Sequence, residues 1–176
     1  MIGHIRGFPS SVPLIAATDA SLHKNCHSAG YAWLAADGRW GMESASRPHW
    51  MAPLTINGAE LRAVALMLRT LVPDLLLTDS AAVTGYLAAW KRGVRDVPPS
   101  YAHSGTLARA MTVVARNDTR MRVEHVPAHR GHLLNEAADS LASIARSRDS
   151  GPAKRERADS LVRSFLISWH QEAGAA

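Results

Sequence analysis

Four carboxylates occupy positions from which they could act together. Asp19 and Asp79 each end a short apolar run, whereas Glu60 and Asp139 each lie near the start of a segment with helical periodicity. Carboxylates that converge in one place repel one another, so each must take up a proton or share a divalent cation. Hard oxygen ligands favour Mg²⁺ or Mn²⁺, and two metals about 4 Å apart suit in-line displacement at phosphorus. The pattern therefore indicates metal-dependent phosphoryl chemistry as one interpretation.

Each acid also has a simpler interpretation when it is taken alone. An aspartate after a strand commonly belongs to a turn or a helix cap. Glu60 follows Asn57 by three residues, the spacing of a capping box. Asp139 would be a solvated helix residue, and Asn135 is expected to cap the helix that carries it. Spacing alone does not choose between these roles and a shared metal site.

The elements that must position the acids follow from hydrophobic periodicity. Strands are predicted over 14–18, 30–34, 39–46, 75–79 and 121–126, and helices over 57–71, 81–92, 105–116, 133–146 and 158–171. Asp37-Gly38 indicates a tight hairpin, so the first three strands form an antiparallel meander. A meander followed by strand–helix units predicts an α/β fold with one five-stranded mixed sheet flanked by helices. The first and fourth strands can then be parallel neighbours whose carboxyl ends meet at one edge.

Composition sets broad limits on the partners and the location of the protein. The 176 residues are 47% hydrophobic, enough for a proper core, and a net charge of +5 permits a polyanionic partner without requiring one. Cys26 is the single cysteine, which excludes an internal disulfide and fits a reducing, cytoplasmic location. Pro9 and Pro13 interrupt any signal peptide, and no apolar run is long enough to predict a membrane span.

Four motifs in order give a more specific indication. They are Thr18-Asp19-Ala20-Ser21 (with Asn25 and Gly30-Tyr31 following), Thr55-Ile56-Asn57-Gly58-Ala59-Glu60-Leu61, Thr78-Asp79-Ser80, and the run from Val126 to Ala142 that contains His129, Asn135 and Asp139. With these motifs the chain resembles a type 1 ribonuclease H over about residues 14–147. Any one short motif carries little weight, but the long fourth motif is specific.

The resemblance implies an endonuclease that hydrolyses the RNA strand of RNA–DNA hybrids with two Mg²⁺ ions, leaving 5′-phosphate and 3′-hydroxyl ends. Mn²⁺ is expected to substitute. Asp19, Glu60, Asp79 and Asp139 would be the catalytic metal ligands. One metal would lower the pKa of the attacking water and the other would stabilise the departing 3′ oxygen. His129 matches a position that serves as a mobile proton carrier or an aid to product release, the alternative being a loop histidine with a local hydrogen bond.

The resemblance also implies a set of substrate contacts. The matching positions are Ser21, Asn25, Thr55, Asn57 and Trp90. Asn57 could read a ribose 2′-hydroxyl, Thr55 and Asn25 would hold a DNA phosphate, and Trp90 would pack beside the DNA strand unless it is a core residue. The segment 90–96 is shorter and less basic than the hybrid-binding protrusion of the family.

The predicted organisation is a loose leader over 1–13, a ribonuclease H domain over 14–147, a charged linker over 148–157, and a C-terminal amphipathic helix and tail over 158–176. The last helix could pack on the domain, mediate self-association or bind a partner; packing, and a monomer, are favoured. Two other functions remain open. One is a resolvase- or transposase-like nuclease, and the other is an inactive nucleic-acid-binding module, against which the presence of all four carboxylates argues.

Overall fold

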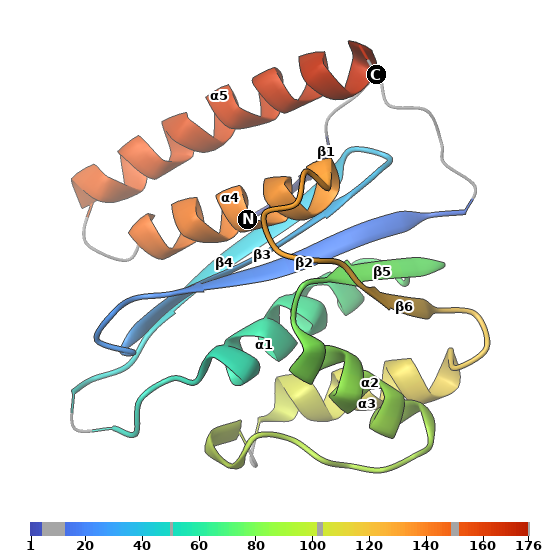
Figure 1. The fold of residues 1–176 in the computed structure, drawn as a ribbon. Helices are drawn as coiled ribbons and strands as arrows, with labels where there is room; N and C mark the ends of the chain where they lie inside the picture. Colours follow the sequence, from blue (N-terminus) through green and yellow to red (C-terminus); the bar gives the residue numbers. More distant parts are fainter. Residues whose placement is uncertain (5–12, 50, 102–103, 149–151, 176) are drawn as a thin grey trace.

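A six-stranded mixed sheet, in the order β1-β4-β3-β2-β5-β6, forms the centre of the molecule (Figure 1). The computed structural model describes residues 1–4, 13–49, 51–101, 104–148 and 152–175. The strands are β1 (Ile2–His4), β2 (Ile15–Leu22), β3 (Ser28–Ala35), β4 (Arg39–Ser46), β5 (Leu75–Thr78) and β6 (Arg122–His125). β2, β3 and β4 form the antiparallel meander, and β5 and β6 extend it in parallel with β2. The predicted α/β fold with a mixed sheet is confirmed.

Helices cover both faces of this sheet. They are α1 (Ile56–Leu68), α2 (Ala81–Lys91), α3 (Gly105–Arg116), α4 (Leu133–Ser147) and α5 (Pro152–Ala175), with a short 3₁₀ turn over Pro99–Tyr101. α1, α2 and α3 lie on one face, and α4 and α5 lie on the other (Figure 1). Each face has its own hydrophobic cluster, because successive strand residues point to opposite sides. No helix in the described part of the chain is both long and apolar enough to cross a membrane.

Two differences from the sequence expectations lie near the chain ends. The sixth strand, β1, falls within the segment expected to be a loose leader, and Ile2 pairs with Gly41 at the sheet edge. Three residues are too few to show strand periodicity, and residues 5–12 of the leader lie outside the described part. The last helix begins at Pro152, inside the expected linker, because proline suits the first turn of a helix. Linker residues 149–151 also lie outside the described part.

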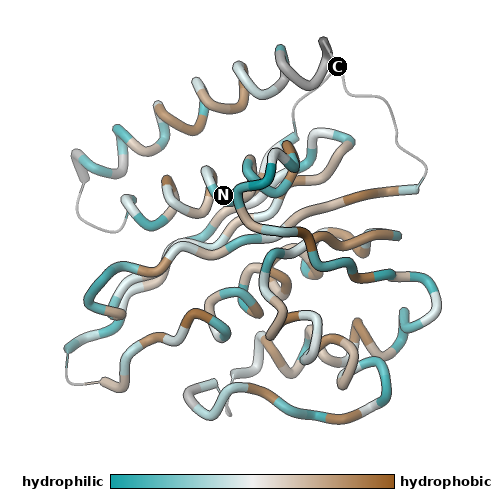
Figure 2. Tube along the Cα trace, in the orientation of Figure 1, coloured by the Kyte–Doolittle hydropathy of each residue, from teal (hydrophilic) through white to brown (hydrophobic). Residues whose placement is uncertain are grey.

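α5 packs on the domain, as favoured from its sequence. Hydrophobic and hydrophilic residues alternate along it (Figure 2), and Val162, Leu166 and Trp169 are buried in the cluster that also contains α4. Arg148, just after α4, forms an ion pair with Asp159 of α5, with Nε and Oδ1 2.8 Å apart. The packing of α5 therefore combines an apolar stripe with a partly buried ion pair.

Gly30 of β3 lets α4 approach the sheet closely. A Cβ atom at this position would lie 2.0 Å from the carbonyl oxygen of Ala142 and 2.3 Å from the backbone nitrogen of Arg146, both in α4. The Arg146 side chain also donates from Nη1 to the carbonyl of Leu22, at 3.0 Å. The height and the direction of α4 are thus fixed against β2 and β3.

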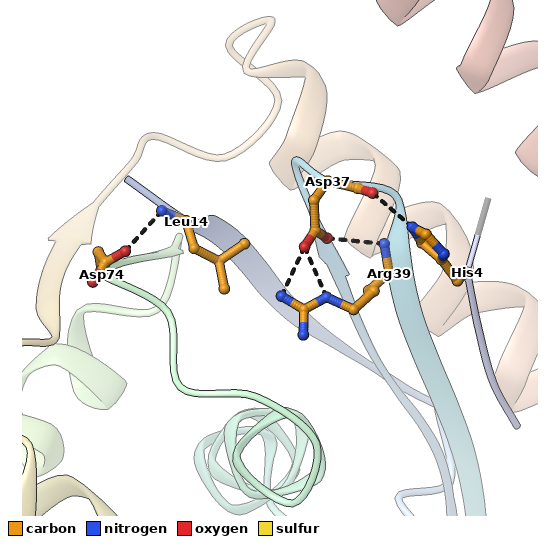
Figure 3. A network of polar contacts seen from close by, with 5 residues as sticks. All are labelled: His4, Leu14, Asp37, Arg39 and Asp74. Atoms are coloured by element: carbon orange, nitrogen blue, oxygen red, sulfur yellow. Dashed lines mark hydrogen bonds and ion pairs between the residues drawn. The ribbon is translucent and has the colours of Figure 1, made fainter. Parts of the chain in front are cut away.

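Two aspartates form hydrogen bonds that fix the start of β2 and the β3–β4 hairpin (Figure 3). Asp74 Oδ2 accepts from the backbone nitrogen of Leu14, at 2.8 Å, which ties the approach to β5 to the start of β2. Asp37 accepts from the backbone and the guanidinium of Arg39, at 3.1 and 2.7 Å, and its carbonyl accepts from His4 Nε2. Burial opposes ionisation of Asp37, but the hydrogen bonds and charge of Arg39 outweigh it and lower the pKa of that carboxyl. The predicted Asp37-Gly38 hairpin is confirmed.

Candidate active site

The parallel pairing of β2 and β5 places Asp19 beside Asp79. Ala17 of β2 lies opposite Leu77 of β5. Asp19 follows Ala17 by two residues, and Asp79 follows Leu77 by two residues. Because side chains alternate along strands, both aspartates point to the same side as Ala17 and Leu77, the side of α4. Asp19 is buried, with 5% of its surface exposed, and Asp79 is half-buried just beyond the strand end.

Glu60 comes from the second turn of α1, which Thr55 caps. Thr55 Oγ1 accepts from the backbone nitrogen of Gly58, at 3.3 Å, so the helix begins two residues earlier than the Asn57 cap expected from the sequence. Glu60 is therefore not part of a capping box. Instead it is 4% exposed, and its carboxylate shares one site with Asp19 and Asp79, with a ligand oxygen from each acid within 4.8 Å of the others.

Asp139 completes the group from α4. The apolar side of this helix, including Ala138 and Leu141, packs on the sheet and leaves Asp139 half-buried next to β2. Its carboxyl is near enough to Asp19 for their charges and a side-chain hydrogen bond to raise the pKa of Asp19. It lies outside the closest group of three acids.

The surroundings of the two buried acids oppose their ionisation. Burial first, then the charges of Asp79 and Asp139, raise the pKa of Asp19 to about 8. Burial and the charges of Asp19 and Asp79 likewise raise the pKa of Glu60 well above its usual value. Glu60 Oε2 is buried and has no hydrogen-bond partner among the described residues. A cluster of hard oxygen donors with an unpartnered oxygen fits a divalent cation, which would compensate the buried charge.

Two residues that contact Asp79 were not expected from the sequence. Asn135 is buried and donates from Nδ2 to Asp79 Oδ2 at 3.4 Å, a long hydrogen bond. It does not cap α4, whose N-cap is His132. His125, at the end of β6, donates from Nε2 to the carbonyl of Asp79 at 3.0 Å. The contact of His125 depends on the pairing of β6 with β5, which the sequence did not specify, and nothing local distinguishes Asn135 from a cap.

His129 and the expected substrate contacts differ in exposure and in their hydrogen bonds. His129 is exposed in the loop before α4, with φ of 51°, and makes no hydrogen bond to the described residues. That observation disfavours a histidine held by a local hydrogen bond. Asn25 and Asn57 are exposed, and Asn25 Oδ1 accepts from the backbone of His27. Ser21, in β2, is half-buried and pairs with Gly30.

Trp90 is the expected substrate contact that the structure places elsewhere. It is 1% exposed within the core of α1, α2 and α3, and its Nε1 donates to the carbonyl of Asp96 at 2.6 Å. A buried indole has no surface to offer a nucleic acid, so the core alternative holds. Thr55, by contrast, is exposed but already accepts the capping hydrogen bond from Gly58.

Comparison with known proteins agrees with the site. Residues 12–147 match the family model described as RNase H. Ribonuclease H of Tropheryma whipplei, in strains Twist and TW08/27, is 35% identical over 141 residues, which span 75% of this chain and 83% of the relative. The matched span contains all four carboxylates, in the order and on the elements described above. The chain therefore belongs to the ribonuclease H family.

Proposed function

We propose that this protein hydrolyses the RNA strand of RNA–DNA hybrids, with divalent cations held by Asp19, Glu60, Asp79 and Asp139. The observation that carries the proposal is the convergence of three carboxylates within 4.8 Å of one another. Asp19 lies within β2, which continues to Leu22 rather than ending before the aspartate as expected, Asp79 follows the end of β5, and Glu60 comes from α1. Membership of the ribonuclease H family supplies the substrate class. The exposed Asn25 and Asn57 and the half-buried Ser21 carry groups suited to sugar and phosphate contacts.

Two Mg²⁺ ions, with Mn²⁺ as a substitute, are the proposed cofactors. When bound, such ions neutralise the carboxylates, lower the pKa of a water and stabilise the charge on a departing 3′ oxygen. The buried, unpartnered Oε2 of Glu60 supports a cation at the Glu60 side of the cluster. Asp139, more open to solvent, supports a second position beside Asp19.

The remaining residues of the site act by holding and moving groups. Asn135 and His125 contact the side chain and the backbone of Asp79 and would thereby orient its carboxylate toward the cations that it is proposed to hold. His129 lies on the exposed loop with no hydrogen bond to the described residues, which suits a proton carrier that moves between solvent and the site. Asn57 is proposed to contact the ribose 2′-hydroxyl, and Ser21, Asn25 and Thr55 the neighbouring backbone.

A monomer in a reducing, cytoplasmic setting is the proposed working form. Cys26 is free, and the apolar stripe of α5 is already used within the chain. A free cysteine and an apolar stripe that packs within the chain are both consistent with a site formed by one protomer.

A cleavage assay on three substrates tests the proposed function. Hybrid, duplex RNA and duplex DNA of one sequence are incubated with the protein in Mg²⁺, and both strands and the product ends are analysed. We expect cleavage of the RNA strand of the hybrid alone, with 5′-phosphate and 3′-hydroxyl products. Cleavage of duplex DNA would instead indicate the resolvase-like alternative, and binding without cleavage would indicate an inactive binding module.

A further inference from the structure

We propose that a basic groove formed with α5 binds the sugar–phosphate backbone of the hybrid beyond the cleavage site. This inference rests on the proposed function for its ligand, but the groove itself lies outside the four-carboxylate site. It has a volume of about 450 Å³ between the end of β2, the end of α4 and the start of α5. Its lining includes His23, Ser28, Arg146, Ser147, Lys154 and Arg157.

Part of this groove is formed by residues that follow the matched ribonuclease H domain. The family match ends at residue 147, and Lys154 and Arg157 lie beyond it in α5. The packing of α5 on α4 brings these two cations beside Arg146. The C-terminal helix thus adds positive charge to a surface that the ribonuclease H domain alone forms only in part.

The charge in the groove is available to a ligand. Lys154 and Arg157 are exposed, are three residues apart on one side of α5, and form no ion pair or hydrogen bond with the described residues. The described residues that line the groove include no carboxylate. Exposed cations without carboxylate partners are the usual contacts for phosphate groups.

The distance from the cleavage site suits a continuous nucleic acid. His23 follows Asp19 by four residues, about 13 Å of extended chain, and Arg146 follows Asp139 by seven, about 10 Å of helix. Both elements run from the site toward the start of α5 (Figure 1). Successive phosphates of one strand advance about 3.4 Å along the duplex axis, so a separation of about 10–13 Å along that axis corresponds to roughly three to four phosphates.

A second region expected to bind the hybrid offers less charge than its sequence indicates. Lys91, in the segment 90–96, donates from Nζ to the carbonyls of Asp118 and Met121 and is thus committed within the domain. Trp90 of that segment is buried. A groove built with α5 would compensate for this small protrusion by binding the hybrid at another point.

The test compares two double variants with equal loss of charge. Lys154→Gln/Arg157→Gln alters the groove, and Arg109→Gln/Arg163→Gln removes two exposed cations that lie outside both the groove and the segment 90–96. Binding of hybrids of about 6 and about 20 base pairs is measured without metal over a range of salt, and single-turnover cleavage is measured in Mg²⁺. Melting curves confirm that each variant folds.

We expect the groove variant to bind the long hybrid about 5- to 10-fold more weakly, with a salt dependence shallower by roughly one to two ions. Binding of the short hybrid and the cleavage rate at saturating long hybrid should not change, and the control should bind both hybrids like the wild type. The inference would be overturned if both variants bound the long hybrid equally more weakly than the wild type, or if neither variant bound it more weakly. Absence of cleavage by the wild type would contradict the proposed function, while binding of the long hybrid would still decide the role of the groove.

Discussion

Asp19 and Glu60 are buried acids in surroundings that resist their ionisation. Such groups reduce the stability of a metal-free protein, because folding removes them from water and brings like charges together. Their pKa values are raised mainly by burial, and only then by the neighbouring carboxylates. In the metal-free protein the two carboxyls therefore favour their protonated forms at neutral pH, and bound cations are expected to favour the charged forms.

The pH dependence of stability follows from this shift. The carboxyl of Asp19 ionises near 4 in the unfolded chain, whereas its pKa in the folded protein is about 8. Between these values the folded state binds the extra proton, so the free energy of unfolding of the metal-free protein falls as pH rises from about 4 to 8. Glu60 acts in the same direction.

The Asp19→Asn variant should remove much of this penalty. We expect it to raise the free energy of unfolding of the metal-free protein by about 1–3 kcal/mol at pH 8 and to change it little at pH 4. Urea unfolding at the two pH values is the measurement. Asp118→Asn, an exposed residue in the turn before β6, is the matched control. An Asp19→Asn variant less stable than the wild type at pH 8 would contradict the assigned burial penalty.

The motifs anticipated that Asp19, Glu60 and Asp79 lie together, whereas local capping rules assigned the wrong residues to two helix starts. Asn57 and Asn135 both looked like helix caps, yet Thr55 and His132 occupy those positions. Capping preferences allow several neighbouring residues, and tertiary contacts decide among them. For Asn135 the deciding contact is with Asp79, which is 56 residues away in the sequence.

At the scale of elements, α5 adds stability and one side of a groove. Its buried stripe contacts the same cluster as α4, the helix that carries Asp139. Residues on its other side are exposed, including Ile167 at 60%. α5 thus packs against α4, while the basic N-terminal part of α5 stays exposed on the surface.

Two adjacent positions in α5 test this packing. Leu166→Ala should lower the free energy of unfolding by roughly 2 kcal/mol or more, because Leu166 is 8% exposed and its removal leaves a cavity. Ile167→Ala, one residue further on, should change it by less than about 0.5 kcal/mol. Urea denaturation measures both. If the two substitutions cost the same, α5 does not dock through the side described here.

Element boundaries followed the strength of the sequence pattern. The strongly periodic helices and the Asp37-Gly38 hairpin were predicted closely, because each has local physical causes. β1 was missed, since an edge strand of three residues depends on its pairing with β4 rather than on its own sequence. The early start of α5 at Pro152 was also missed, because a charged segment can be either a linker or a solvated helical turn.

For the whole molecule, the meander and the parallel pairing of the first and fourth predicted strands could be anticipated, because few arrangements suit a meander followed by strand–helix units. The parallel pairing of β2 with β5 then brings Asp19 and Asp79 together, as expected. The choice between the two roles left open for Trp90, and the groove beside α5, could not be settled in this way. Both depend on how three or more elements pack, which no local pattern specifies.

The central claim is that the carboxylate cluster performs metal-dependent cleavage of the RNA strand. The most direct measurement is the single-turnover rate of RNA cleavage. It is measured with Mg²⁺ and a saturating concentration of protein over hybrid, for the wild type, Asp79→Asn and the remote control Asp118→Asn. We predict that Asp79→Asn loses at least about 100-fold in rate, since even the outer partners of metal ligands contribute about 10- to 100-fold. It should melt like the wild type and still bind the hybrid, and the control should cleave normally. An Asp79→Asn variant that cleaves within about twofold of the wild type would contradict the account.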